Sequence, residues 1–289
     1  MVSTEQFDLS APAFERHRDW RRHMATGNKL ALITGASAGI GECIANELAE
    51  AGYDVILVAR REQALRGVAN YIEQEFGVEA HVYAADLLEP DAVAALAVWV
   101  DEEGFDIDVL VNNAGVLEAG AFSDIEPDVL QRMVQLNVGV LTDLLSYFLP
   151  AMQARGAGRV LNVASVAAFQ PVVGLASYAA TKAYVLSLTE ARVEELRGSG
   201  VTVTALCPGI TETAMMEHAG ESNASFREVP SVLVSDPKDV AEAGVRGMMK
   251  GEAIVIPGAL NQATALLSSR SPKWILRRLT GSLGRRFLD

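Results

Sequence analysis

Tyr178 and Lys182 have the residue types and the spacing of an acid–base pair. They stand four residues apart in the segment SYAATKAY, so a helix there would carry both side chains on one face. A free tyrosine has a pKa of about 10, which is too high for efficient proton transfer at neutral pH. A neighbouring ammonium favours the phenolate and is expected to lower that pKa toward the useful range. Ser165, thirteen residues upstream of Tyr178, is the third candidate.

A sheet of parallel strands is the framework predicted to position these side chains. Seven short, β-branched segments alternate with helix-length segments from Lys29 onward: KLALIT, DVILVA, EAHVYAAD, IDVLVNNAG, GRVLNVAS, GVTVTALCPG and EAIVIPG. Their nearly continuous apolar character is typical of strands covered on both faces. The pattern predicts an α/β fold, a doubly wound parallel seven-stranded sheet of the Rossmann type in a single domain. Ligands bind beyond the carboxyl ends of such strands, where Ser165 follows the fifth strand.

The first strand leads directly into a glycine-rich segment, TGASAGIG, at residues 34–41. Glycine at positions 35, 39 and 41 allows a tight turn and a close approach of the backbone to a ligand. A helix is predicted to follow, and the N–H groups at its start can bind a diphosphate. The location between a first strand and a first helix therefore predicts a dinucleotide site.

Two arginines end the second strand, in the segment DVILVARRE. In a dinucleotide site, an acid about 20 residues after the glycine loop binds the ribose hydroxyls of NAD, whereas an arginine accommodates the 2′-phosphate of NADP. Arg60 lies 19 residues after Gly41, and Ala59 stands where the acid is expected. Arg60 and Arg61 therefore favour NADP(H) over NAD(H). The alternative is a solvated helix start, although cations there oppose the helix dipole.

With these motifs in order, the chain resembles a short-chain dehydrogenase/reductase of the single-domain type. The resemblance extends over about Lys29 to Pro257 and rests on TGASAGIG, Asp86 after the third strand, NNAG at 112–115, Asn137 in LNVG, Ser165, Tyr178, Lys182, and PG at 208–209. It implies hydride transfer between a nicotinamide cofactor and a carbonyl compound or secondary alcohol. One departure is Ala38, because NADP-preferring members often carry a basic residue just before the second glycine of the loop.

The resemblance also implies a role for each site residue. Tyr178 would protonate the carbonyl oxygen or deprotonate the alcohol, and Lys182 would lower its pKa and hold the nicotinamide ribose. Ser165 would hydrogen-bond the substrate oxygen, and Asn137 would hold a water in the proton relay. Cofactor contacts are implied for a larger set: Gly35, Ser37, Gly39, Ile40, Gly41, Arg60, Arg61, Asp86, Leu87, Asn113, Ala114, Gly115, Tyr178, Lys182, Pro208, Gly209, Thr211 and Thr213.

Composition argues against several other classes of function. The chain of 289 residues has a formal charge of −13 and a pI near 4.8, which argues against nucleic-acid binding. Cys43 and Cys207 belong to no metal or redox motif, and the four histidines lack metal-ligand spacing, so no metal is expected. Two unpaired cysteines, with no signal-peptide pattern and no long apolar window, predict a cytoplasmic protein.

Both ends of the chain and one long loop extend beyond this framework. We expect an N-terminal arm over residues 1–28, a dehydrogenase domain over 29–258 and a basic amphipathic tail over 259–289. The tail could dock on its own domain or on a partner subunit, touch an anionic membrane surface, or be disordered. By resemblance, the loop from Thr211 to Val234 covers an apolar ketone, aldehyde or alcohol, and the chain forms a homodimer or homotetramer.

Three alternative functions follow from the same fold. A non-catalytic NADP-binding sensor would be expected to lack Tyr178 or Lys182, and both are present. An isomerase or dehydratase that cycles hydride within one turnover usually has a larger C-terminal substrate domain, and only about 30 residues follow the last strand. An NAD-dependent alcohol dehydrogenase is the alternative if the two arginines serve only the protein surface.

Overall fold

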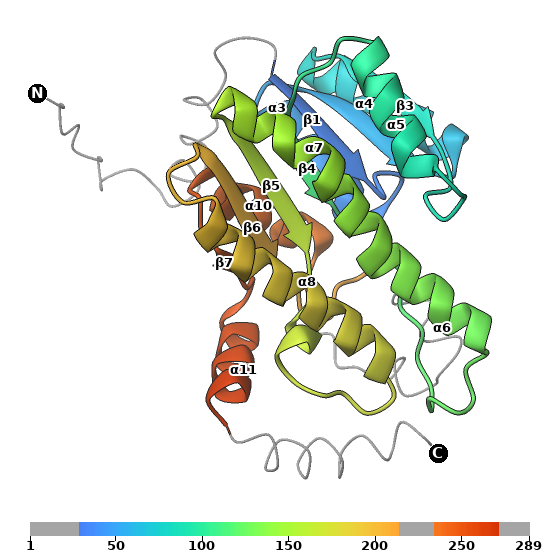
Figure 1. Ribbon diagram of the computed structural model, residues 1–289, viewed down its shortest axis with the longest axis vertical. Helices are drawn as coiled ribbons and strands as arrows, with labels where there is room; N and C mark the ends of the chain where they lie inside the picture. The colour runs from blue at the N-terminus through green and yellow to red at the C-terminus, as the bar shows by residue number, and fades with distance from the viewer. Residues whose placement is uncertain (1–28, 214–233, 272–289) are drawn as a thin grey trace, which may run out of the picture.

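The computed structural model describes residues 29–213 and 234–271 (Figure 1). Seven parallel strands form one sheet in the order β3-β2-β1-β4-β5-β6-β7, which confirms the predicted fold. Their bounds are β1 Lys29–Thr34, β2 Tyr53–Ala59, β3 Ala80–Ala84, β4 Ile107–Asn112, β5 Gly158–Val163, β6 Val201–Leu206 and β7 Ile254–Val255. The predicted N-terminal arm, residues 272–289 of the tail and residues 214–233 of the long loop lie outside the described residues.

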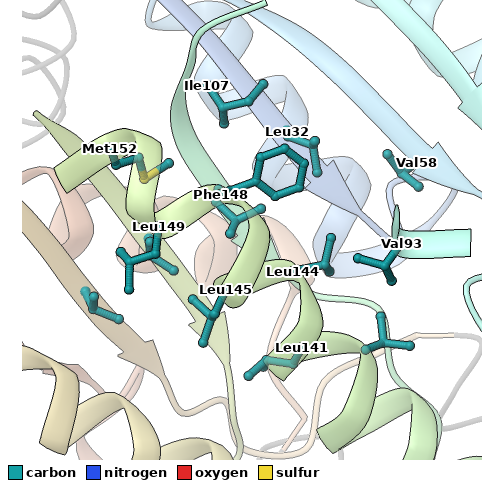
Figure 2. Packing of buried hydrophobic residues seen from close by; sticks show 14 of the residues in the cluster. Leu32, Val58, Val93, Ile107, Leu141, Leu144, Leu145, Phe148, Leu149 and Met152 are labelled. Carbon is teal, nitrogen blue, oxygen red and sulfur yellow. The ribbon is translucent and has the colours of Figure 1, made fainter. Parts of the chain in front are cut away.

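Helices cover both faces of the sheet. One face packs against α5 (Ala92–Glu102), α7 (Leu141–Arg155) and α8 (Ala176–Glu195), and the other against α3 (Gly39–Glu50), α4 (Glu62–Phe76) and α10 (Pro237–Met249). Alternate residues of one strand pack against the two helix layers: Leu32 lies in the core with α5, α7 and α8, and Ile33 lies in the core with α3, α4 and α10. Figure 2 shows the first of these cores, where Phe148 of α7 lies beside Leu32 of the sheet.

The remaining helices lie around the carboxyl end of the sheet. They are α6 (Pro127–Val134), the π-helical turn η1 (Gln135–Val140) that joins it to α7, the short 3-10 helix η2 (Val166–Phe169), and α11 (Ala259–Arg270). None of the helices in the described ranges is both long and apolar enough to cross a membrane. The 3-10 helix η2 closely follows β5, and the π-helical turn η1 lies between α6 and α7, so both direct side chains differently from a regular α-helix.

The order of the strands changes direction between β1 and β4. From β1 the chain winds outward through β2 to β3, and it then returns to β4 and winds the opposite way to β7. In such sheets the loops after the two central strands diverge, which opens a crevice beyond their carboxyl ends. The loops after β1 and β4 carry the glycine-rich segment and the NNAG segment, so the fold brings both predicted motifs to this crevice.

Candidate active site

The glycine-rich loop is held in place by the end of β4. Asn113 donates hydrogen bonds from its side-chain nitrogen to the carbonyl oxygens of Thr34 and Gly35, at 2.9 and 3.2 Å. Gly35 has a φ of +68°, and a Cβ there would lie 2.7 Å from the same nitrogen of Asn113. A side chain at Gly41 would collide with Asn113 and with the carbonyl of Gly35. Glycine is therefore required where α3 approaches the loop.

The first N–H groups of α3 have no partner within the helix and can bind an anion. The helix begins at Gly39 after Ala38, which has no side-chain oxygen to cap it. Gly39, Ile40 and Gly41 line the cavity described below, so these amides lie beside a space that a ligand can fill. Together with the helix dipole, this is the arrangement that binds a diphosphate. The loop therefore fits a dinucleotide cofactor.

The two arginines after β2 lie on the outer side of the same loop. Arg61 donates from its Nη2 to the carbonyl oxygen and the Oγ of Ser37, both at 3.3 Å. The Nη1 of Arg60 lies 3.9 Å from a carboxylate oxygen of Asp86, and its side chain is 69% exposed. Arg61 immediately precedes α4 without capping it, so helix geometry does not account for its contact with the loop. Arg61 thus lies against Ser37 of the loop, and the largely exposed Arg60 lies near Asp86.

Ser165, Tyr178 and Lys182 come together beyond the end of β5. Ser165 lies between β5 and η2, and its Oγ accepts a hydrogen bond from the N–H of Ala167 at 3.1 Å. The side chain of Tyr178 lies close enough to Ser165 for the serine to lower the pKa of the phenol. Lys182 lies one turn further along α8, and its Nζ donates to the carbonyl oxygen of Val163 at 2.8 Å. The predicted acid–base group is therefore assembled at one point, and each member is at most 8% exposed.

Burial changes the pKa of both members of the pair. Desolvation raises the pKa of Tyr178 to about 12, against a smaller lowering by Ser165. Lys182 is not among the causes of this shift, since its Nζ is bonded to a carbonyl and lies 5.7 Å from the centre of the ring. The lowering of the Tyr178 pKa by Lys182 when the cofactor is bound stays a prediction. Burial also lowers the pKa of Lys182 to about 8.

Asn137 lies behind these residues, in the π-helical turn η1, and is 1% exposed. Its side-chain oxygen accepts from the N–H of Val116 at 2.9 Å. Its side-chain nitrogen donates to the carbonyl of Val116 at 2.9 Å and to the Oγ1 of Thr181 at 3.1 Å. Both polar atoms of the amide are thus committed to protein partners. The amide links the segment after β4 to α8, one residue before Lys182.

A cavity of about 460 Å³ joins the glycine loop to the acid–base group. Most predicted site residues line it: Gly35, Gly39, Ile40, Gly41, Asn113, Ala114, Gly115, Ser165, Tyr178, Lys182, Pro208, Gly209, Thr211 and Thr213. The others lie outside its lining, namely Ser37, Arg60, Arg61, Asp86, Leu87 and Asn137. Leu87 packs in the hydrophobic core with 6% exposure.

Part of the wall was not identified from the sequence. It comes from the segment between η2 and α8 and includes Gln170, Val172, Val173 and Leu175. The only signal was the length of this connection, since a chain that leaves β5 and returns as α8 must pass over the strand ends. Among the described residues, no group of three or more His, Cys, Asp or Glu could hold a metal ion.

Comparison with known proteins places this geometry in a family. The family model described as short chain dehydrogenase matches residues 29–224, which span the sheet from β1 to β6 and the cavity residues on it. The chain belongs to the short-chain dehydrogenase family. It is accordingly an NAD(P)-dependent oxidoreductase that acts on alcohol and carbonyl groups.

Several other short-chain dehydrogenases resemble the chain over most of its length. The 3-oxoacyl-(acyl-carrier-protein) reductase of Vibrio cholerae is 32% identical over 80% of this chain and 93% of its own. A structure of a short-chain dehydrogenase from Sphingobium yanoikuyae in complex with NADPH is 33% identical, with a TM-score of 0.74 over 84% of this chain and 96% of that one. The bulky-bulky ketone specific alcohol dehydrogenase from Comamonas testosteroni is 30% identical, with a TM-score of 0.71 over 86% and 96%.

Proposed function

We propose that the protein is an NADP(H)-preferring reductase of apolar ketones or aldehydes. The observation that carries the cofactor preference is the contact of Arg61 with Ser37 in the glycine-rich loop, with Ala59 where an acid would repel a 2′-phosphate. Arg60 lies beside Asp86 with most of its side chain in solvent, so it can turn toward the same phosphate. The NADPH complex of the relative from Sphingobium yanoikuyae supports the same choice.

Tyr178 and Ser165 act on the substrate oxygen in this proposal. When bound, the nicotinamide cofactor supplies or accepts the hydride. Tyr178 donates its phenolic proton to the oxygen, and the hydroxyl of Ser165 binds the same oxygen and polarises the carbonyl. Because burial raises the pKa of Tyr178 to about 12, the phenol is protonated across the neutral range. The protonated phenol is the form that donates a proton, so the protein without ligands already has the form of Tyr178 that reduction of a carbonyl substrate needs.

In this proposal Lys182 transfers protons and binds the nicotinamide ribose, and Asn137 holds a water of the proton relay. A pKa of about 8 lets Lys182 both release and take up a proton close to neutral pH, so it can reprotonate Tyr178 after turnover. Lys182 also holds the nicotinamide ribose in the proposed arrangement. Since the side chain of Asn137 is bonded to Val116 and Thr181, a water in the relay would be held by its main-chain carbonyl.

The apolar character of the cavity supports the proposed substrate class. Beyond Ser165 the wall is formed by Val166, Ala167, Val172, Val173 and Leu175, which bring hydrocarbon surface toward Tyr178. Burying such surface favours a ligand with apolar groups on both sides of its carbonyl, at roughly 25 cal/mol per Å². The relative from Comamonas testosteroni is named for bulky ketones, which fits a wall of this kind.

Parallel fluorescence titrations with NADPH and NADH test the cofactor assignment. We expect NADPH to bind at least about 10-fold more tightly, which corresponds to about 1.4 kcal/mol. A set of ketones and aldehydes is then assayed with the preferred cofactor. Equal or tighter binding of NADH would contradict the role of the arginines, and binding of neither cofactor would contradict the reductase proposal.

We also propose that the protein forms a homodimer through α7 and α8, or a homotetramer that includes this contact. The large side chains Val134, Tyr147 and Tyr184 are 46%, 48% and 39% exposed on α6, α7 and α8. The hydroxyls of Tyr184 and Thr142 are 3.0 Å apart and tie α8 to α7, so the two helices offer one continuous surface. Aromatic residues are enriched in subunit interfaces for their large contact area.

Substitution of Tyr147 by glutamate is expected to shift the assembly toward monomers, because a charge would be buried between subunits. Light scattering coupled to size-exclusion chromatography measures the mass. Tyr71→Glu is the matched control, since Tyr71 is 52% exposed on α4, which lies on the other face of the sheet. A monomeric wild type, or the same mass for both variants, would rule this interface out.

A further inference from the structure

Gln170 introduces an amide into the otherwise apolar part of the cavity wall. It directly follows η2, as Ser165 directly precedes it, so one short helix holds both side chains at the cavity. The neighbouring wall residues Ala167, Val172 and Val173 offer no side-chain hydrogen bonds. A polar group in such surroundings has few protein partners and is the natural point of contact for a polar group on a ligand.

The amide of Gln170 is oriented from a distant part of the chain. Ser268 on α11 donates from its Oγ to the Oε1 of Gln170 at 2.9 Å, across 98 residues of sequence. Ser268 is 6% exposed, and Ala265 on the same face of α11 is 3% exposed, so this side of the helix is packed against η2. The contact is therefore part of the folded interior rather than a surface encounter.

The bond with Ser268 decides which atom of Gln170 is left for a ligand. With the oxygen accepting from Ser268, the side-chain nitrogen is the free end of the amide, and it can only donate. Within residues 29–213 and 234–271 this nitrogen has no hydrogen-bond partner. A donor left unpaired beside a bound apolar ligand is unfavourable, so a ligand that presents an acceptor there is selected over one that does not.

We propose that Gln170 is a specificity-determining residue that donates a hydrogen bond to a second acceptor oxygen of the substrate, separate from the reacting carbonyl. Ser268 is the positioning residue that holds the amide in the donating orientation. The inference rests on the proposed reductase function and deepens it. The substrate class becomes carbonyl compounds that carry an ester, ether or second carbonyl oxygen at a short distance from the reacting carbon.

Two ketones of equal chain length test the proposal with NADPH as the reductant. Ethyl 3-oxohexanoate and 4-nonanone have the same number of chain atoms on each side of the ketone, but the first has an ester beside it. Their intrinsic reactivities differ, so the measured quantity is the ratio of their kcat/KM values and its change among variants. We expect Gln170→Leu to lower this ratio by about 10-fold through loss of the donor.

The variants at Ser268 separate positioning from general stability. Ser268→Ala is expected to lower the ratio in the same direction as Gln170→Leu but by less, and Ser268→Thr to retain it because the hydroxyl is kept. Thr264→Ala is the matched control: Thr264 is exposed on α11 and bonds only to the carbonyl of Leu260 among the described residues, at 2.9 Å. An unchanged ratio in Gln170→Leu overturns the specificity role, and an unchanged ratio in Ser268→Ala overturns the positioning role.

Binding of the two ketones to the complex of protein and NADP⁺, measured by calorimetry, separates this inference from the reductase proposal. Turnover of neither ketone, or of any carbonyl compound tried, would count against the reductase proposal. In that case the ratio of the two dissociation constants still decides the role of Gln170. Tighter binding of the oxoester that is lost in Gln170→Leu supports it, and the same ratio in the wild type and the variant overturns it.

Discussion

Replacement of Tyr178 by phenylalanine is expected to lower the rate of ketone reduction by roughly 10²- to 10⁴-fold, the range typical for loss of a general acid. The substitution removes one hydroxyl and keeps the ring, which packs with Met133, Leu175 and Ala179 in a small buried cluster. The fold and the glycine-rich loop are therefore unaffected, and NADPH should bind as it does to the wild type. Steady-state turnover and cofactor fluorescence measure the two quantities separately.

Tyr184→Phe is the control for this variant. It removes a phenolic hydroxyl from the same helix, but one that is bonded to Thr142 in the proposed subunit contact and that lies outside the lining of the cavity. The control should retain full turnover per cofactor-binding site. A Tyr178→Phe protein with a rate within about 10-fold of the wild type would mean that another group supplies the proton.

The pKa of Tyr178 is also the clearest case of a property that the sequence could not supply. The four-residue spacing to Lys182 correctly placed both residues on one face of α8, because helical periodicity is a local property of the chain. Whether the ammonium or desolvation determines the pKa of the phenol depends on the residues that surround both groups. Here the carbonyl of Val163, on β5, holds the ammonium, and burial raises the pKa. Such contacts depend on how distant segments pack.

The other features of the site divide in the same way: those set by local sequence patterns could be predicted, and those set by contacts between distant segments could not. The seven strands and their doubly wound parallel sheet followed from local apolar patterns and from the connection rules of parallel sheets, so the crevice and its glycine loop could be predicted. The amide of Asn137, by contrast, is bonded to Val116 and Thr181, 21 and 44 residues away. The bond between Gln170 and Ser268 spans a still longer separation and had no signature in either segment.

Replacement of both Arg60 and Arg61 by alanine is expected to weaken NADPH binding by roughly 10- to 100-fold, with little change for NADH. Each charge-assisted hydrogen bond to a phosphate contributes about 1.5–3 kcal/mol, and solvent exposure of Arg60 reduces its share. NADH lacks the phosphate, so removal of the two charges deprives it of no partner. The preference of the wild type should also shrink as salt is raised, because both guanidinium groups lie in solvent-accessible positions.

Arg66→Ala distinguishes a specific phosphate contact from a general effect of positive charge. Arg66 is exposed on α4 and pairs with Glu62 at 2.7 Å, close in sequence to the two arginines but with no contact to the loop among the residues described. If NADPH affinity reflected only the local field, Arg66→Ala would weaken it almost as much as either single substitution at Arg60 or Arg61. If Arg61 binds the phosphate from its place on Ser37, Arg61→Ala weakens NADPH binding and Arg66→Ala leaves it unchanged. Equal losses for NADH and NADPH in the double variant would instead assign the arginines to holding the loop, and the cofactor preference would need another cause.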